Sequence, residues 1–165
     1  MHNPLFLIGF MASGKTSIGR KLAKAWQMNF IDLDKAIEES EQMTINQIFE
    51  TKGEEYFRQL ETESLQKLDV ENTIVATGGG TACFHDNIAI MQTKGKVIYI
   101  DVPTKILIGR LKQQKDSRPL VKDLDEKQLI DFVNQTMEKR LPFYGQADVC
   151  IDGTLGMGRI KEFLS

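Results

Sequence analysis

The first residues able to do chemistry lie in the stretch GFMASGKT, from Gly9 to Thr16. Its spacing fits G-x-x-x-x-G-K-[ST], in which the backbone N–H groups of a tight loop surround a phosphate chain. A short apolar run precedes it and a helical pattern from Ser17 to Trp26 follows, so the order of strand, loop and helix that the motif requires is present. The alternative is a chance match in an ordinary turn. We favour a phosphate site, because a helix N-terminus also attracts anions.

Within this stretch, one lysine and one hydroxyl have specific expected roles. Lys15 would reach the β- and γ-phosphates of a nucleotide, and the Thr16 hydroxyl would bind Mg²⁺. The residues expected to contact the nucleotide here are Gly9, Ala12, Ser13, Gly14, Lys15, Thr16 and Ser17.

Two carboxylates, Asp32 and Asp34, form a second group at the end of an alternating apolar segment that begins at Asn29. Carboxylates at the C-terminal end of a strand lie where open α/β sheets bind ligands. Aspartate is also a favoured N-cap, so either residue alternatively caps a helix expected to begin at Lys35. We favour a site role for both, because the phosphate loop ends the neighbouring strand.

Three successive glycines follow the apolar segment 73–76, in the sequence Thr77-Gly78-Gly79-Gly80. Glycines after a buried strand cost backbone entropy, so the chain must need close backbone approach or an unusual φ there. A plain tight turn seldom needs three. The triplet is therefore a second candidate for ligand contact.

An arginine on the helical pattern 54–68 has two possible roles. Four glutamates accompany Arg58 there: Glu54, Glu55, Glu61 and Glu63. From the residues alone, this pattern favours an ion pair on the helix surface.

The segment from Lys112 to Lys127, KQQKDSRPLVKDLDEK, has few large apolar residues and is interrupted by Pro119. This composition is typical of a mobile lid. A lid that carries an arginine, here Arg118, suits phosphoryl transfer, because closing expels water and brings positive charge to the transferred group. A solvated surface loop is an equally compatible alternative.

The elements that must position these groups are five apolar strand segments alternating with helical patterns, at 5–8, 29–34, 73–76, 97–101 and 148–152. This alternation indicates an α/β domain, with a parallel sheet covered by helices on both faces. The helical pattern 129–141 is expected to end at Arg140, before Pro142. No apolar run ends in D-E or D-x-x-G, which would mark a motor ATPase or GTPase, so a small-molecule kinase is the remaining class.

Length and composition limit the other possibilities. A chain of 165 residues predicts one domain, and a net charge of -2 provides no field for nucleic acid or anionic lipid. No signal peptide or membrane span is expected. Cys83 and Cys150 lack metal spacing and are expected to be reduced thiols of a cytoplasmic protein. His2 and His85 form no pair, and neither is assigned a catalytic role.

Jointly, these motifs resemble the shikimate kinase family in order and approximate spacing. The residues that carry the resemblance are GFMASGKT, Asp32-Leu33-Asp34, Glu55-Tyr56-Phe57-Arg58, Thr77-Gly78-Gly79-Gly80, Ser117-Arg118-Pro119-Leu120, and Arg140 with Tyr144. The resemblance covers almost the whole chain. It implies a three-layer α/β/α P-loop kinase fold like that of the nucleoside monophosphate kinases, with five parallel strands in the order 2-3-1-4-5 and a mobile lid. It also implies MgATP-dependent phosphorylation of the 3-hydroxyl of shikimate, in the pathway to chorismate and the aromatic amino acids.

The resemblance assigns a role to each charged candidate. Arg58 and Arg140 would bind the substrate carboxylate, since a guanidinium pairs with it bidentately. The glutamates near Arg58 would then only keep the rest of the helix soluble. Asp34 would orient the attacking hydroxyl and accept its proton. Asp32 would hold Mg²⁺ together with Thr16, through water.

For the remaining positions, the resemblance implies contacts with both substrates. Gly78, Gly79 and Gly80 would contact the acceptor, and Gly79 and Gly80 would present backbone N–H groups to the acceptor and to the γ-phosphate. Arg118 would meet the phosphates and Arg110 would stack on adenine. Phe57 would form an apolar wall of the acceptor pocket, and a core position is the open alternative.

One departure concerns Ala12, which stands where the family often has glycine and is expected in an αR or β conformation. The implied ligands are ATP, Mg²⁺ and shikimate, with no nucleic acid or membrane partner and a monomeric chain. Two other functions remain, a gluconate or nucleoside monophosphate kinase and a nucleotide-binding module without catalysis. The first does not explain Asp34, Arg58 and Arg140 together. The second would have lost Lys15, Asp34 or the lid arginine, and all three are present.

Overall fold

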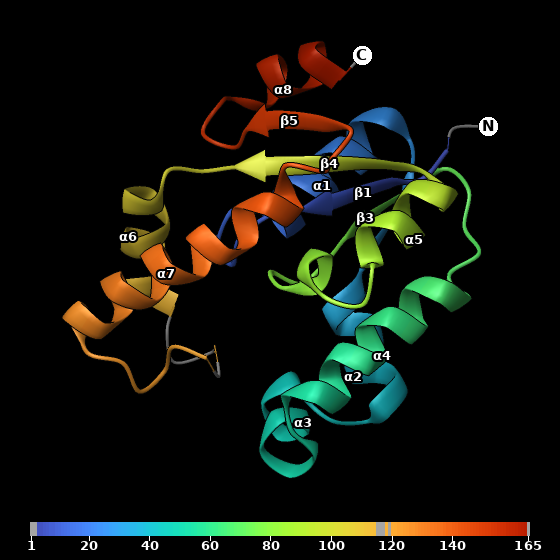
Figure 1. Ribbon diagram of the computed structural model, residues 1–165. Helices are drawn as coiled ribbons and strands as arrows, with labels where there is room; N and C mark the ends of the chain where they lie inside the picture. The colour runs from blue at the N-terminus through green and yellow to red at the C-terminus, as the bar shows by residue number, and fades with distance from the viewer. Residues whose placement is uncertain (1–2, 115–117, 119, 165) are drawn as a thin grey trace.

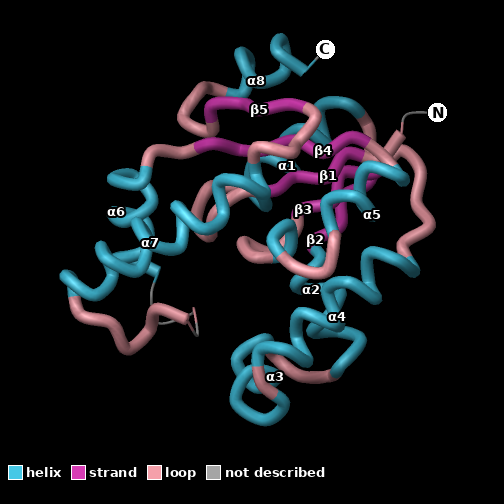
Figure 2. Tube along the Cα trace, viewed as in Figure 1, coloured by secondary structure: helices cyan, strands magenta, loops and turns pink. Residues whose placement is uncertain are grey.

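The sheet at the centre of the molecule has five parallel strands in the computed structural model, which describes residues 3–114, 118 and 120–164 (Figure 1). The strands are β1 (Leu5–Ile8), β2 (Asn29–Asp32), β3 (Thr73–Ala76), β4 (Lys96–Asp101) and β5 (Val149–Asp152). Their order is β2-β3-β1-β4-β5, and every neighbouring pair is parallel (Figure 2). The predicted α/β fold class and strand order are confirmed.

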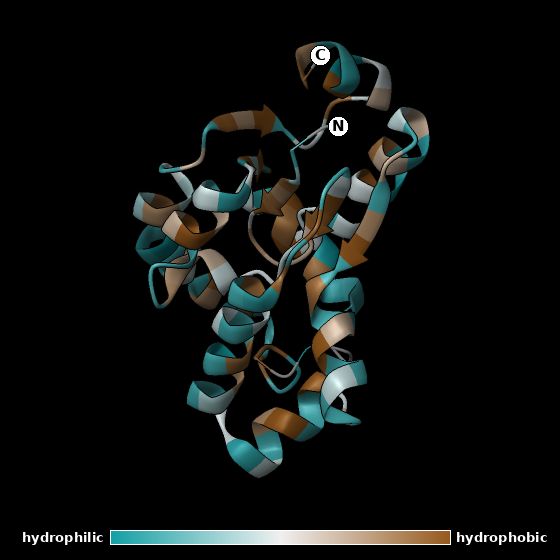
Figure 3. Cartoon of the chain, turned by 90° about the vertical axis from the view of Figure 1, so that its right-hand side faces the viewer, coloured by the Kyte–Doolittle hydropathy of each residue, from teal (hydrophilic) through white to brown (hydrophobic). Residues whose placement is uncertain are grey.

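The inner strands are largely apolar, as expected where helices cover both of their faces. All four residues of β3 are buried, as are Phe6, Leu7 and Ile8 of β1. A parallel strand buried on two faces is expected to form such a continuous apolar run. In Figure 3 the strands at the centre are brown, and much of the surrounding helix surface is teal.

Helices form the two outer layers and a separate group below the sheet. Their bounds are α1 (Lys15–Trp26), α2 (Leu33–Glu41), α3 (Ile45–Lys52), α4 (Glu54–Lys67), α5 (Asn87–Lys94), α6 (Thr104–Gln114), α7 (Glu126–Tyr144) and α8 (Met157–Leu164), with a 3-10 turn η1 (Thr81–Cys83). Helix α1 lies behind the sheet, and α5 and α7 lie in front of it (Figure 1). Helices α2, α3 and α4 follow β2 and precede β3 in the sequence, and they pack on one another (Figures 1 and 2). In the described part of the chain, no helix is both long and apolar enough to cross a membrane.

Several predicted boundaries are wrong. The second strand ends at Asp32, because this residue is the N-cap of a helix that begins at Leu33 rather than at Lys35. Helix α7 continues through Pro142 to Tyr144. Proline removes only one backbone hydrogen-bond donor from this last turn of the helix. The turn is still closed by the Gly145 N–H, which donates to the Leu141 carbonyl at 2.9 Å.

The predicted lid is described only in part. Residues 115–117 and 119, and therefore Ser117 and Pro119, lie outside the described residues, as does His2. In the described part, α6 extends to Gln114 and residues 120–123 form turns. Helix α7 begins earlier than predicted, because Asp125 and Gln128 form a capping box at its N-terminus.

Candidate active site

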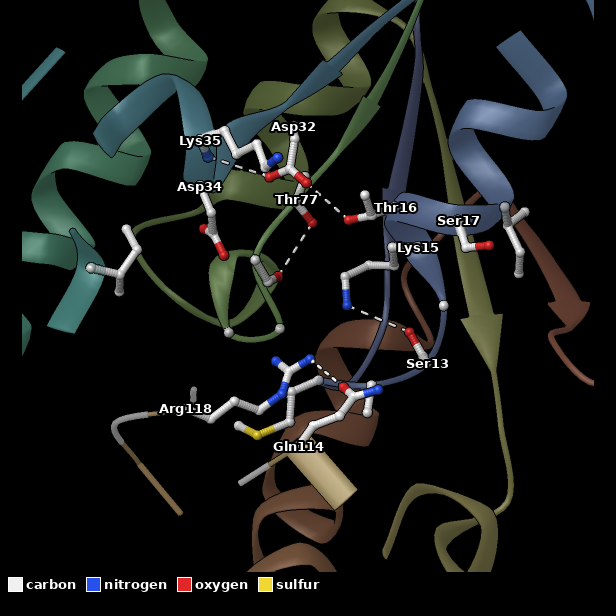
Figure 4. Close-up of a pocket in the computed structure, with 18 of the residues that line it drawn as sticks. Ser13, Lys15, Thr16, Ser17, Asp32, Asp34, Lys35, Thr77, Gln114 and Arg118 are labelled. Carbon is white, nitrogen blue, oxygen red and sulfur yellow. Dashed lines mark hydrogen bonds between the residues drawn. The ribbon is translucent and has the colours of Figure 1, made fainter. Parts of the chain in front are cut away.

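A pocket of about 1050 Å³ opens at the carboxyl ends of β1, β2 and β3. It is lined by the phosphate loop, the start of α2, α3, α4, the glycine triplet, Arg110 and Arg118, Arg140 of α7, and residues 153–157. The sheet therefore brings together segments from almost the whole length of the chain. Figure 4 shows Lys15, Asp34 and Arg118 pointing into this space from different elements.

The phosphate loop holds Lys15 against its own backbone. The Lys15 Nζ donates to the carbonyls of Gly9 and Phe10 at 2.8 Å each, and to the Ser13 Oγ at 3.4 Å. Burial lowers the pKa of Lys15 to about 7, although Asp34 acts in the opposite direction. The loop carbonyls thus hold the Lys15 ammonium at the position where it would contact a bound anion.

Two loop glycines meet a steric requirement. Gly9 has φ 147° and Gly14 has φ 95°, both in the left-handed region. A Cβ on Gly9 would stand 2.7 Å from the Ile100 carbonyl oxygen. Only glycine fits this close approach to β4 without a shift of the backbone.

The prediction for Ala12 is wrong, because this residue has φ 62°. The loop turns back at this point, and the carbonyl of Ala12 accepts a hydrogen bond from the Arg110 Nη1 at 2.9 Å. A left-handed conformation costs an L-residue about 1–2 kcal/mol. The loop therefore retains the geometry of a glycine at a position where the chain has a methyl group.

The Thr16 hydroxyl and Asp32 lie side by side, as a shared Mg²⁺ site would require. The Thr16 Oγ1 donates to the Asp32 Oδ2 at 2.9 Å, and the Asp32 Oδ1 accepts from the Lys35 N–H at 3.3 Å (Figure 4). Asp32 is thus a helix cap and a site residue at once. The described residues hold no cluster of three or more His, Cys, Asp or Glu suited to a metal. Mg²⁺ commonly takes few protein oxygens and completes its shell with phosphates and water, so these two residues fit it.

Asp34 lies in the first turn of α2 and lines the pocket. Its Oδ1 is buried and has no hydrogen-bond partner among the described residues. Burial raises the pKa of Asp34 to about 7, and the carboxylates of Glu61 and Asp32 add to this effect. A buried acceptor without a donor is expected to bind one from a ligand.

Arg58 is not a surface residue, and the expectation that its glutamate neighbours only keep the helix soluble is wrong for Glu61. It is 3% exposed and its Nη1 contacts the Glu61 Oε2 at 2.7 Å, while its Nε and Nη2 contact the Glu54 Oε1 at 3.3 and 3.0 Å. Glu61 is fully buried and also accepts from the Thr81 hydroxyl. Burial disfavours the charged guanidinium, but the two glutamates outweigh it and raise the pKa of Arg58. Glu61 therefore holds Arg58 in place and does not serve solubility.

Arg140 approaches the pocket from α7. Its Nη1 donates to the Gly79 carbonyl at 3.1 Å, and its guanidinium carbon lies 5.3 Å from the centre of the Phe10 ring. It is 8% exposed. The structure thus places Arg58 and Arg140 on the same pocket, Arg58 next to Gly80 and Arg140 on the Gly79 carbonyl.

The glycine triplet is required by close approach and not by unusual φ. A Cβ on Gly78 would stand 2.8 Å from the Glu61 Oε1 and 2.9 Å from the Asp34 Oδ1. On Gly79 it would stand 2.8 Å from the backbone nitrogen of Met11, and on Gly80 it would stand 2.7 Å from both terminal nitrogens of Arg58. Each glycine therefore faces a different part of the site.

The remaining predicted residues also line the pocket. Arg118 is half-buried, its Nη2 donates to the Gln114 Oε1 at 3.2 Å, and its Nε is buried without a partner among the described residues. Phe57 lines the pocket and also packs on Phe49 with ring centres 5.1 Å apart, so it is both wall and core. Arg110 lines the other end of the pocket.

Sequence reasoning missed two parts of this site. Glu61 was interpreted as a surface charge, although it lies at four-residue spacing between Phe57 and Leu65, both on the buried face of α4. The other part is a turn whose residues Gly153, Leu155, Gly156 and Met157 line the pocket, and no sequence motif marks it.

Comparison with known proteins yields one consistent family. A family model described as shikimate kinase matches residues 11–158. A shikimate kinase of Phocaeicola vulgatus is 42% identical over 144 residues, which is 87% of this chain and 82% of that protein. A shikimate kinase of Sulfurihydrogenibium is 40% identical over 149 residues, covering 90% of this chain and 86% of that protein.

Solved structures agree with the sequence comparison. The crystal structure of shikimate kinase from Bacteroides thetaiotaomicron superposes with a TM-score of 0.91 at 35% identity, covering 98% of both chains. Shikimate kinase from Acinetobacter baumannii in complex with shikimate gives a TM-score of 0.88 at 31% identity, covering 99% of this chain and 92% of that one. A gluconokinase from Sinorhizobium meliloti, at 15% identity and a TM-score of 0.58, shares the fold alone.

Proposed function

The chain belongs to the shikimate kinase family, and from that premise we propose that its pocket transfers the γ-phosphoryl group of ATP to the 3-hydroxyl of shikimate. The enzymes of this family are kinases that act on a shikimate hydroxyl in aromatic amino-acid biosynthesis. The proposal concerns which residues of this chain carry out the reaction.

At the nucleotide end, the phosphate loop binds the phosphate chain through its backbone. Lys15 exchanges the loop carbonyls for the β- and γ-phosphates, whose negative charge raises the Lys15 pKa above 7 and keeps the ammonium charged. The nucleobase lies between Arg110 and the wall formed by residues 153–157. Thr16 and Asp32 would hold Mg²⁺, which would supply positive charge to the phosphate oxygens.

At the acceptor end, the shikimate carboxylate lies between Arg58 and Arg140. Both guanidiniums line the pocket, and Glu54 and Glu61 orient that of Arg58 while leaving it further N–H groups for a ligand. Phe57 supplies apolar surface for the ring. This arrangement gives the acceptor one orientation, with its hydroxyls toward Asp34.

Asp34 then acts on the reacting hydroxyl. Its unpartnered Oδ1 accepts the hydrogen bond of the 3-hydroxyl and directs that oxygen at the γ-phosphorus. The new bond joins this oxygen to phosphorus, the bond from phosphorus to the β,γ-bridging oxygen breaks with its electron pair leaving on ADP, and the hydroxyl proton moves to Asp34. A carboxylate with a pKa near 7 is suited to accept this proton.

Arg118 supplies positive charge as the lid closes. The described end of the lid already contacts the acceptor-binding helices, since the Lys122 Nζ lies 3.3 Å from the Glu50 Oε1 of α3. This ion pair links the segment to α3 and supports its closure over the substrates.

We also propose that the enzyme acts as a monomer in the cytoplasm. All the groups invoked above come from one chain, so the site needs no second copy. The cytoplasm supplies MgATP, and a net charge of -2 favours neither nucleic acid nor anionic membranes as partners.

The single observation that carries this proposal is the buried, unpartnered Asp34 Oδ1 beside Lys15 in a pocket with two arginines. A coupled ADP-release assay with MgATP tests it, with shikimate, quinate, gluconate and a panel of nucleoside monophosphates as acceptors. Turnover with shikimate alone is expected. Turnover with another acceptor only, or undiminished turnover by Asp34→Asn, would contradict the assignment.

A further inference from the structure

A buried tyrosine outside the roles given above contacts the glycine triplet. Tyr144, the last residue of α7, is fully buried, and its hydroxyl donates to the Gly79 carbonyl at 2.6 Å. Its ring stacks on that of Tyr99 in β4, with centres 4.9 Å apart and an interplanar angle of 18°. The Tyr99 hydroxyl donates elsewhere, to the Asp101 Oδ1 at 3.0 Å.

The Gly79 carbonyl accepts two hydrogen bonds from one helix. Arg140 and Tyr144 are four residues apart, so their side chains lie on the same face of α7. Both donate to this one oxygen, at 3.1 and 2.6 Å. Helix α7 therefore fixes the direction in which the carbonyl points.

The direction of this carbonyl also fixes the neighbouring amide. A peptide is planar and trans, so the N–H of Gly80 points opposite to the carbonyl of Gly79, away from α7. Gly80 lines the pocket and adjoins the guanidinium of Arg58. If the peptide turned over, it would present a carbonyl oxygen where an anionic acceptor is expected to bind.

The triplet has little conformational preference of its own. Glycine rotates more freely about φ and ψ than any other residue, so three in succession do not hold a peptide in one orientation. An external restraint is therefore needed if the Gly80 amide is to serve as a donor.

We propose that Tyr144 is a positioning residue for the acceptor, which holds the Gly79–Gly80 peptide so that the Gly80 N–H is presented to shikimate between Arg58 and Arg140. This inference rests on the proposed function. The stack on Tyr99 fixes the ring, and burial raises the pKa of Tyr144, so that its hydroxyl remains a donor at any physiological pH.

The aromatic pair offers a matched comparison. Tyr144→Phe and Tyr99→Phe each remove one hydroxyl and keep both stacked rings, but only the first removes a bond to the glycine triplet. Tyr144→Phe is expected to raise KM for shikimate by about fivefold to tenfold, the effect of one lost hydrogen bond, with KM for ATP and Tm close to those of Tyr99→Phe.

A second measurement does not depend on turnover. Backbone ¹⁵N relaxation of Gly80 is expected to show greater mobility in Tyr144→Phe than in the wild type or in Tyr99→Phe. Equal shikimate KM values in the two variants, or unchanged Gly80 relaxation, would overturn the proposal. If the wild type fails to phosphorylate shikimate, the proposed function is wrong, and Gly80 relaxation still decides whether Tyr144 holds the loop.

Discussion

The two ends of the pocket are built in different ways. The nucleotide end consists largely of the backbone of one continuous segment, and Lys15 there bonds to the carbonyls of its own loop. The acceptor end consists of charged side chains from α2, α4 and α7 that meet only in the folded protein. At the first end the geometry is set within one segment of the chain, and substitution of Lys15 changes a charge without breaking an ion pair between distant elements. At the second end Arg58 is paired with the buried Glu61, so a substitution of this arginine alters folding and binding together.

Loss of the lysine charge tests the nucleotide end and has the largest expected effect. Lys15→Met is expected to reduce kcat by about a thousandfold, because one preorganised charge on the transferred phosphate is lost. Tm is not expected to fall, since burial already disfavours this ammonium. Steady-state kinetics and thermal unfolding measure both quantities. Lys24→Met, at an exposed position of the same helix, is the control, and near-normal kcat in Lys15→Met would refute the phosphate-site assignment.

Removal of the arginines tests the acceptor end. Arg58→Ala and Arg140→Ala are each expected to weaken shikimate binding by about 2–4 kcal/mol in calorimetry, with ATP binding little changed. Arg58→Ala also removes the cation paired with the buried carboxylate of Glu61, so it should in addition destabilise the fold by about 3 kcal/mol. Equal losses for shikimate and ATP would contradict the division of the pocket.

The charge on Asp34 links binding to stability. Its pKa is about 7 in the folded protein and 3.8 when unperturbed, so between these values the unfolded chain has lost a proton that the folded chain retains. Wild-type stability should therefore fall, relative to Asp34→Asn, as the pH rises from about 4 to 7. Above pH 7 the variant should be more stable by roughly 2 kcal/mol, after a discount for partial exposure of the side chain. Urea unfolding at several pH values measures this, with the exposed Asp131→Asn as control, and a pH-independent difference would refute it.

The smallest effect concerns the backbone of the nucleotide end. Ala12→Gly relieves the left-handed conformation at φ 62° and should stabilise the protein by up to about 1 kcal/mol, since the greater freedom of glycine in the unfolded chain offsets part of the gain. Turnover is expected to stay within twofold. A lower Tm in differential scanning calorimetry would show that the loop holds this conformation without strain.

What the sequence predicts follows the same division. The phosphate loop was predicted because its residues are contiguous, and β3 was predicted to the residue because a fully buried strand has a clear apolar boundary. The conformation of Ala12 was not, because it depends on the bond that Arg110 makes across the fold. Likewise, spacing predicts a pair between Arg58 and Glu61, but it does not show that the pair is buried.

The glycine triplet limits how this enzyme can change. Each of the three positions already touches a group that the reaction uses, so any side chain added there displaces Asp34, Glu61, Arg58 or the phosphate loop. An inhibitor that binds at the acceptor end would contact the glycine triplet. A point substitution at any of these three glycines would disturb the site itself, so it could not serve to exclude the inhibitor. Drug resistance would then have to arise at other positions, such as Phe57, whose side chain also lines the pocket.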